Sequence, residues 1–159
     1  MNTKLLIGVI GNQGSGKSTT WSTLFDRKVH TGKNLRKLEI NGVKIPVFLI
    51  NESALERKTS LEYILPDNDP QIVISSFLYH KDVKSNFEYF HKKGYDLYVQ
   101  WLNPGFSDPN EKALFYNEGI INFLLGLGTT VSVKNGKLSP QHRVQELKNY
   151  IFAWHLSKL

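Results

Sequence analysis

The sequence predicts an α/β protein in which helices cover both faces of a mostly parallel sheet. Short apolar runs alternate with segments of helical periodicity along the chain. The first run, residues 5–10, is continuously apolar, as in a strand that is buried on both faces. The dipeptide Asn41-Gly42, a strong hairpin signal, adds an antiparallel margin to this sheet. We expect a single domain over residues 1–159, because the sequence contains no repeat and no linker-like stretch.

The predicted elements alternate between strands and helices. In order they are strand 5–10, helix 17–25, a hairpin around Asn41-Gly42 that continues through 47–50, helix 53–65, strand 72–74 ending at Ser75-Ser76, helix 82–93, strand 97–102, helix 110–125, strand 129–133 and a final helix after Ser139-Pro140. The pattern for helix 110–125 is the weakest of these.

Local signals support each element of the first half. The helix at 17–25 carries three apolar residues at helical spacing, Trp21, Leu24 and Phe25. In the second strand of the hairpin, Pro46 has no N–H to donate, so we expect pairing on one side only near it. Pro66 and the turn-rich residues after it close the helix predicted at 53–65.

The second half is bounded in the same way. The helix at 82–93 ends at Gly94 and presents one apolar face, made of Val83, Phe87 and Phe90. The pair Ser139-Pro140 has the order expected at the start of a helix. The buried stripe of that last helix is formed by Val144, Leu147, Ile151 and Trp154.

Composition excludes several classes of protein. No cysteine is present, so the chain forms no disulfide, and we expect a cytoplasmic location. The apolar stretch at 119–128 is far shorter than the roughly 20 residues needed to cross a bilayer, so we expect no membrane association. The net charge of +6 attracts anions but is modest for a dedicated nucleic-acid binder.

The segment after the first strand, GNQGSGKS, matches the pattern G-x-x-x-x-G-K-[ST] at every fixed position. Glycines allow such a loop to form a concave set of N–H groups, and the following helix adds its positive end. A strand before the motif and a helix after it are the setting that the pattern requires. The predicted contacts to a phosphate chain are Gly11, Asn12, Gln13, Gly14, Ser15, Gly16, Lys17, Ser18 and Thr19.

These residues resemble the P-loop NTPase superfamily, and through the order of strands and helices the resemblance extends over most of the chain. It implies a three-layer P-loop fold that binds a nucleoside triphosphate with Mg²⁺. In that role Lys17 contacts the β- and γ-phosphates and acts in catalysis, and the Ser18 hydroxyl holds the metal. The superfamily includes hydrolases, kinases and inactive binders, so membership does not define the reaction.

A second polar site is expected where the run 47–50 ends, at Asn51 and Glu52. P-loop proteins place an acid at such a strand end. Here Asn51 is the candidate metal contact and Glu52 the candidate catalytic group that orients the nucleophile. The alternative is that Glu52 only caps a helix that starts near Ser53.

Two branches of the superfamily are similar to this chain. A P-loop, a helix, a basic loop and a hairpin also follow one another in small GTPases, where Thr31 would approach the metal. The D-x-x-G and N/T-K-x-D motifs of GTPases are missing, so ATP is expected by elimination, with GTP as the alternative. The second branch is small kinases, in which Lys112, Arg36 or Arg57 would have to contact the phosphoryl group, since no arginine lies between Arg57 and Arg143.

The basic segment, which begins at Arg27 and ends at Lys37, contains five lysines and arginines and no acid. It is either a solvated face or the docking site of a nucleic acid or a phosphorylated acceptor. Three functions stay open: an NTP hydrolase activated by a protein partner or a second copy, a kinase acting on a nucleoside, nucleotide or polynucleotide, and a nucleotide sensor without turnover.

Overall fold

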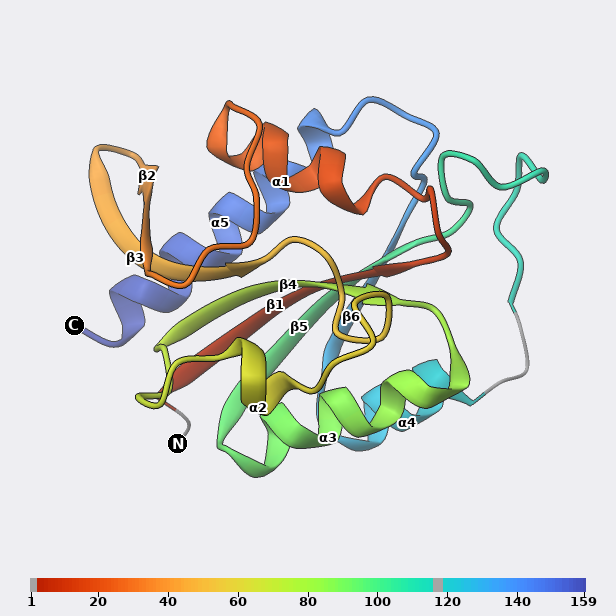
Figure 1. Cartoon of the computed structure of the whole chain (residues 1–159). Helices are drawn as coiled ribbons and strands as arrows, with labels where there is room; N and C mark the ends of the chain where they lie inside the picture. Colours follow the sequence, from red (N-terminus) through yellow and green to blue (C-terminus); the bar gives the residue numbers. More distant parts are fainter. Residues whose placement is uncertain (1–2, 116–118) are drawn as a thin grey trace.

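The computed structural model describes residues 3–115 and 119–159. Its centre is a six-stranded sheet with the order β2-β3-β4-β1-β5-β6 (Figure 1). The strands are β1 (Lys4–Gly11), β2 (Arg36–Ile40), β3 (Val43–Ile50), β4 (Ile72–Leu78), β5 (Tyr95–Leu102) and β6 (Thr130–Lys134). All neighbours are parallel except β2 and β3, which form the antiparallel margin. This confirms the predicted α/β class, the mostly parallel sheet and the hairpin at its edge.

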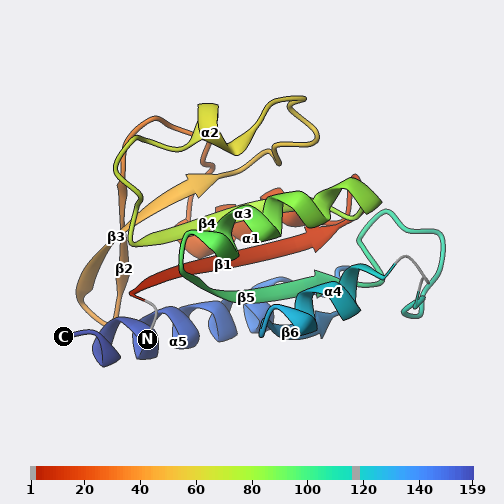
Figure 2. The ribbon, with the colours of Figure 1, turned by 90° about the horizontal axis from the view of Figure 1, so that it is seen from below.

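Helices cover both faces of the sheet, which makes three layers (Figures 1 and 2). One face carries α1 (Lys17–Phe25) and α5 (Gln141–Ser157). The other carries α2 (Leu61–Ile64), α3 (Lys84–Lys92) with the short 3₁₀ turn η1 (Lys81–Val83) before it, and α4 (Ile120–Gly126). No helix within these described ranges is both long enough and apolar enough to cross a membrane.

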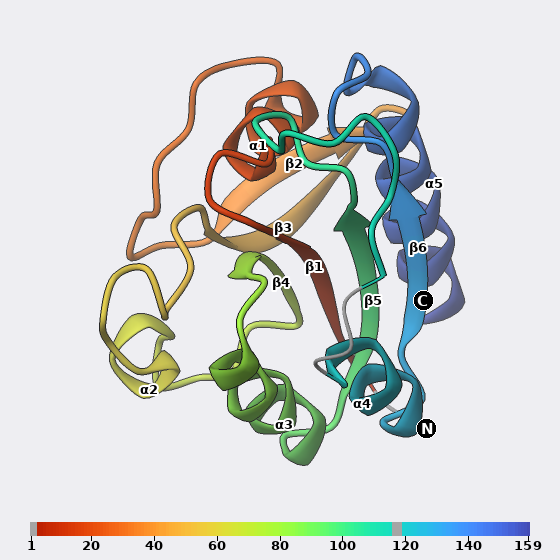
Figure 3. The ribbon, with the colours of Figure 1, turned by 90° about the vertical axis from the view of Figure 1, so that its right-hand side faces the viewer.

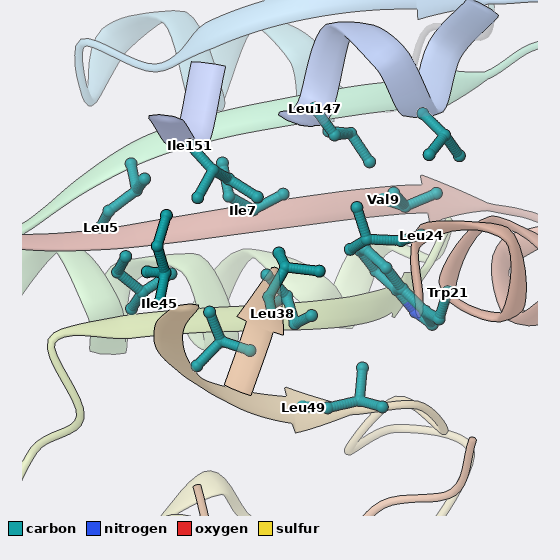
Figure 4. Close-up of a cluster of buried hydrophobic side chains, with 14 of the residues drawn as sticks. Leu5, Ile7, Val9, Trp21, Leu24, Leu38, Ile45, Leu49, Leu147 and Ile151 are labelled. Carbon is teal, nitrogen blue, oxygen red and sulfur yellow. The ribbon is translucent and has the colours of Figure 1, made fainter. Parts of the chain in front are cut away.

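Strand β1 divides the core into two clusters, because its side chains alternate between the faces. Leu5, Ile7 and Val9 pack on the α1 and α5 side, where Figure 4 shows them below Leu147 and Ile151. Leu6 and Ile10 belong to the cluster on the opposite face, together with side chains of α3 and α4. The continuous apolar run therefore serves two layers, as a strand buried on both faces requires.

The hairpin turn has the geometry that its sequence predicts. Asn41 and Gly42 both have positive φ, at 52° and 77°, as in a tight two-residue turn. Pro46 pairs with Lys37 of β2, whereas the pairing of β3 with β4 starts only at Phe48. Pairing at the proline is thus one-sided, as expected from its missing N–H.

The helix predicted at 53–65 is wrong in most of its length, since only Leu61–Ile64 is helical. Residues 53–58 form a single turn that ends at Lys58, whose φ of 54° is left-handed and stops propagation. The N–H groups of Lys58 and Thr59 close this turn on the carbonyls of Leu55 and Ala54. We call residues 53–58 the Glu56 turn.

The helix predicted at 110–125 is also shorter than expected, and residues 116–118 of it lie outside the described ranges. Before them, the side chain of Asn103 donates to the carbonyl of Leu114 at 2.7 Å and accepts from its N–H at 2.9 Å. These bonds satisfy backbone groups that a helix would otherwise use, so the chain stays irregular there.

Strand β4 continues to Leu78, two residues beyond its predicted end at Ser75-Ser76. Ser75 and Ser76 are buried inside it, and their hydroxyls are hydrogen-bonded. Trp21 of α1 donates its indole N–H to the hydroxyl of Ser76 at 2.7 Å. The strand therefore accommodates polar side chains because each finds a partner.

Replacing Ser76 by Ala leaves the buried indole N–H of Trp21 without this acceptor. We expect the free energy of unfolding to fall by about 1–3 kcal/mol, measured by urea denaturation. The control is Ser85→Ala, whose hydroxyl makes an exposed bond to Asp82 and whose loss should change stability by less than about 0.5 kcal/mol. Equal stability of Ser76→Ala and the unaltered protein would contradict the role given to this bond.

Candidate functional site

The loops that follow β1, β5 and β6 meet at the edge of the sheet where these strands end (Figure 3). They are the glycine loop (residues 11–18), the second loop (103–108) and the third loop (135–140). Together with the end of β3 they surround a cleft of about 810 Å³. Its lining residues are Gly14, Ser15, Gly16, Lys17, Ser18, Thr19, Asn51, Glu52, Glu56, Phe106, Ser107, Gly136, Lys137, Leu138, Ser139, Pro140 and Arg143. Ligands of parallel sheets commonly bind at this edge.

The glycine loop turns its carbonyl groups towards the second loop. The carbonyls of Gly14 and Ser15 accept the N–H groups of Ser107 at 3.1 Å and of Phe106 at 3.0 Å. The first bond of α1 runs from Thr20 N to Gly16 O at 3.1 Å. Five residues that line the cleft have a backbone N–H without an acceptor among the described residues, namely Gly14, Gly16, Lys17, Ser18 and Thr19. The cleft therefore offers a row of free donors at the positive end of a helix.

Two glycines allow the loops to approach one another backbone to backbone. A Cβ on Gly105 would lie 2.6 Å from Cβ and 2.9 Å from Cα of Ser15. A Cβ on Gly136 would lie 2.7 Å from the carbonyl oxygen of Ser15 and 3.0 Å from that of Pro104. The N–H of Gly136 also donates to Pro104 O at 2.7 Å. Only glycine fits at either position without moving the glycine loop.

Asp108 connects these loops through its side chain and its backbone. Its carboxylate accepts from the backbone N–H of Gly105 at 2.8 Å and from the side-chain amide of Asn12 at 3.2 Å. Lys137 of the third loop donates to the Asp108 carbonyl at 2.6 Å. The Asn12 side chain is thus engaged in holding the loops together. Of the predicted phosphate contacts, Gly14 to Thr19 line the cleft, whereas Gly11, Asn12 and Gln13 do not.

Lys17 is nearly buried, with a side-chain exposure of 7 %. Its ammonium group donates to the carbonyls of Gly11 and Asn12, at 3.1 Å each, and lies 3.7 Å from a carboxylate oxygen of Glu56. Burial lowers the pKa of Lys17, and the nearby Glu56 carboxylate opposes part of that shift. Glu56 was not among the residues predicted for the site, although the spacing Ser53-x-x-Glu56 is that of a capping box.

Asn51 and Glu52 reach the cleft from β3, even though β4 lies between β3 and β1. The Asn51 backbone N–H donates to the Thr31 hydroxyl at 2.8 Å, and its side-chain N–H₂ donates to Val29 O at 3.1 Å. The side-chain oxygen of Asn51 is buried without a partner among the described residues. These bonds also place the basic segment beside the cleft.

Glu52 is exposed, and its carboxylate makes no hydrogen bond or ion pair within the described part of the chain. The alternative in which it caps a helix near Ser53 is wrong, because the chain forms only a turn there. Ser53 and Glu56 make the capping contacts of that turn instead. Glu52 is therefore available to a molecule in the cleft.

Arg143 is a second buried cation at the cleft, with 4 % of the residue exposed. Its guanidinium donates to Thr20 Oγ1 at 3.2 Å and to the carbonyls of Gly16 and Leu138 at 3.4 Å each. All three acceptors are neutral, and burial lowers the pKa of Arg143. Arg143 was not among the residues predicted for the site. Its burial could have been predicted from its position four residues before Leu147, which places it on the buried stripe of α5.

The other cations considered for a phosphoryl group lie elsewhere. Arg36, Arg57 and Lys112 do not line the cleft. Arg36 is half-buried and donates to the carbonyl of His30 in the basic segment, whereas Arg57 and Lys112 are exposed. The mouth of the cleft also has an apolar side, where Phe106 and Leu138 are 65 % and 66 % exposed.

The donor set at the cleft suits a magnesium ion that arrives with phosphate groups. Mg²⁺ prefers oxygen ligands and is usually held by one or two protein oxygens plus substrate phosphates and water. Ser18, which carries a hydroxyl, and Asn51, whose side-chain oxygen is buried without a partner among the described residues, both line the cleft. A dedicated cage of three or more histidines or carboxylates is not found among residues 3–115 and 119–159.

Replacing Gly105 by Ala should push the second loop away from Ser15. We expect the free energy of unfolding to fall by about 1–3 kcal/mol in urea denaturation, with faster hydrogen exchange over residues 14–18. The matched control is Gly126→Ala in α4, where nothing lies within 4 Å of the new Cβ and stability should rise by up to about 1 kcal/mol. Effects of the same sign in both variants would contradict a specific contact at Ser15.

Comparison of the chain with protein-family models, with curated proteins and with solved structures finds no significant match in any of the three. The similarity of the glycine loop to a P-loop therefore stays a prediction from its own residues. Its support comes from the local geometry: the free N–H groups, the two buried cations and the cleft beside them.

Proposed function

We propose that this protein is a P-loop NTPase that binds a nucleoside triphosphate with Mg²⁺ in the cleft and hydrolyses its terminal phosphoanhydride bond. One observation carries the proposal. The free N–H groups at the start of α1 lie beside two buried cations, Lys17 and Arg143, of which only Lys17 faces a carboxylate among the described residues, that of Glu56. Unsatisfied donors and excess buried positive charge are costly unless an anion compensates them.

The remaining cleft has the size and character of a nucleotide site. Its volume of about 810 Å³ lies within the range typical of small-molecule pockets. The phosphate chain would lie against residues 14–19, and the apolar side formed by Phe106 and Leu138 suits the flat face of a base. ATP is preferred over GTP because the sequence lacks the guanine-selecting motifs.

The chain's own residues have distinct tasks in this reaction. Lys17 and the N–H groups of the loop stabilise the negative charge on the transferring phosphoryl group. Ser18 and Asn51 would hold the magnesium ion, which neutralises phosphate charge. Glu52 orients a water molecule, whose oxygen forms a bond to the γ-phosphorus while the bond to the β,γ-bridging oxygen breaks. The nucleoside diphosphate leaves, and the proton of the water passes to Glu52 or to the released phosphate.

Unassisted hydrolysis should be slow, because Arg143 is already held by neutral oxygens of the loop and helix. No other arginine lines the cleft within the described ranges. We therefore include in the proposal an activating arginine from a protein partner or from a second copy of the chain, as P-loop NTPases commonly use.

A specific contact favours a second candidate, phosphoryl transfer to an acceptor on the basic segment. Val29 and Thr31 of that segment are hydrogen-bonded to Asn51 at the cleft. The exposed cations of the segment, with no ion pair among the described residues, are Arg27, Lys28, Lys33 and Lys37. A polynucleotide or a phosphorylated acceptor bound there would lie next to the nucleotide. A sensor that binds without turnover is the third candidate.

Glu52→Gln tests the hydrolase directly. We expect phosphate release from ATP with Mg²⁺ to fall by about 100-fold or more, because the carboxylate that orients water is lost. Nucleotide affinity, measured by calorimetry, should change less than about twofold, because Glu52 contacts no described residue that shapes the loop. The matched control is Glu62→Gln on the exposed face of α2, which should leave both unchanged.

Each other outcome has a defined meaning. Unchanged phosphate release in Glu52→Gln would remove Glu52 from the mechanism. Binding without phosphate release in the unaltered protein would favour the sensor, and label transfer from ATP to an added nucleoside, nucleotide or oligonucleotide would favour the kinase. Absence of heat with ATP, GTP, CTP and UTP in the presence of magnesium would refute the proposed function.

The basic segment is tested by the pair Lys28→Gln and Lys33→Gln. We expect oligonucleotide affinity to fall, and the slope of log affinity against log salt to become shallower by about 1.4–1.8, because two phosphate contacts are lost. The control pair, Lys81→Gln and Lys112→Gln, makes the same change in net charge at two other exposed lysines. Equal effects of the two pairs would show that only overall charge matters.

A further inference from the structure

We propose that Glu56 and the γ-phosphate compete for Lys17, so that a bound triphosphate displaces Glu56 and releases the Glu56 turn. This inference rests on the proposed nucleotide site and adds a regulatory contact to it. It assigns to Glu56 a positioning role: its carboxylate pairs with Lys17 until a phosphate group takes its place, and the turn then responds to the bound phosphate. Glu56 lies four residues after Glu52, so the reporting turn is continuous with the catalytic segment.

The contacts of Lys17 determine which partner an incoming anion can replace. An ammonium group has three N–H donors. Two of them are directed to Gly11 O and Asn12 O, which belong to the glycine loop itself. The remaining neighbour is Glu56 Oε1, at a distance of 3.7 Å that is an ion pair rather than a close hydrogen bond. Among these three partners Glu56 is the longest contact and lies outside the glycine loop, so it is the partner that we expect a phosphate oxygen to replace.

The two anions cannot share Lys17 at close range. A phosphate oxygen and a carboxylate oxygen bound to one ammonium group would lie near each other in a partly buried site, where their repulsion is weakly screened. The phosphate chain gains the free N–H groups of Gly14 and of residues 16–19 in addition to the Lys17 side chain. Glu56 gains only Lys17 and the Ser53 hydroxyl. The phosphate group therefore binds Lys17 more strongly than Glu56 does, and the Glu56 carboxylate moves away from Lys17.

The turn that carries Glu56 is closed by the reciprocal cap of Ser53 and Glu56 and by three backbone bonds, from the N–H groups of Arg57, Lys58 and Thr59. Ser53 Oγ donates to Glu56 Oε1 at 2.7 Å and accepts from the Glu56 N–H at 3.2 Å. Arg57 N bonds to Ser53 O at 3.0 Å, and the turn ends at the left-handed Lys58. The oxygen bonded to Ser53 is the same one that faces Lys17. Displacing this oxygen from Lys17 therefore disturbs the reciprocal cap of the turn as well.

Glu56→Gln tests the competition, because glutamine keeps an oxygen for the Ser53 hydroxyl but removes the negative charge. We expect this variant to bind ATP about threefold more tightly or better in calorimetry, both with Mg²⁺ and with EDTA. The matched control, Glu62→Gln, should bind like the unaltered protein. Equal or weaker binding by Glu56→Gln with EDTA would overturn the proposal, and a loss confined to magnesium would instead identify Glu56 as a metal ligand.

The pH profile gives a readout that a purely structural role would not change. Glu56 raises the pKa of Lys17 against the effect of burial, so its removal lowers that pKa. Lys17 then loses its charge at a lower pH, and ATP affinity of Glu56→Gln should decline at a lower alkaline pH than that of the unaltered protein. If the ATP affinity of the two proteins declined at the same alkaline pH, that result would contradict the contact between Glu56 and Lys17.

Hydrogen exchange tests the release of the turn. In the unaltered protein, ATP should speed exchange at the N–H groups of Arg57, Lys58 and Thr59, whose bonds close the turn. In Glu56→Gln these N–H groups should exchange faster before ATP is added, with little further change. Slower exchange on binding in the unaltered protein would overturn the release.

Failure of the inference and failure of the proposed function are distinguishable. If the unaltered protein gives no heat with ATP or with inorganic tripolyphosphate, the phosphate site itself is refuted and this inference with it. If the unaltered protein binds ATP and Glu56→Gln binds equally well with the same alkaline limb, only the inference is refuted. Thermal unfolding followed by circular dichroism checks that each variant is folded.

Discussion

Backbone contact at Ser15 is the constraint on which the candidate site depends. Gly105 and Gly136 approach this residue so closely that no side chain fits between them. The second loop also donates to the carbonyls of Gly14 and Ser15, while the N–H groups of Gly14, Gly16, Lys17 and Ser18 have no acceptor among the described residues. A glycine-rich segment is thereby held in one conformation by contacts with its neighbours.

Charge at the cleft follows from the same packing. Lys17 and Arg143 are buried because the loops and α5 close around them, and burial lowers the pKa of both side chains. Neutral oxygens surround Arg143, whereas Lys17 faces Glu56. This difference separates their roles: the arginine secures the loop to α5, and the lysine keeps one exchangeable partner. The preference for an anion thus arises from how the site is built as well as from its residue types.

Much of the fold was predictable because local signals agree with the tertiary structure. Helix α1 has the predicted bounds, and the apolar runs and Asn41-Gly42 identify β1 and the hairpin. The helix at 53–65 failed because Ser53 and Glu56 satisfy the backbone locally and Lys58 turns left-handed. The place of β4 between β3 and β1 depends on long-range pairing, which periodicity does not encode.

The site was predictable only in part for a similar reason. The glycine loop is a local pattern, and Asn51 and Glu52 follow from the rule that ligands gather at strand ends. The close approach of Gly105 and Gly136 to Ser15 is a tertiary contact between residues far apart in the sequence. The burial of Arg143 was not predicted because charged residues are usually exposed, although its spacing places it on the buried face of α5. The sequence pattern around Glu56 indicates a capping box, but it does not predict the tertiary contact of Glu56 with Lys17.

The bonds from Arg143 to Gly16 and Thr20 join the start of the chain to its last helix, across more than 120 residues. During synthesis the glycine loop emerges from the ribosome long before α5 does. A nascent chain that ends before α5 would expose the apolar side of α1 and leave the loop without its arginine brace. The pocket is thus assembled last, although its signature residues are translated first.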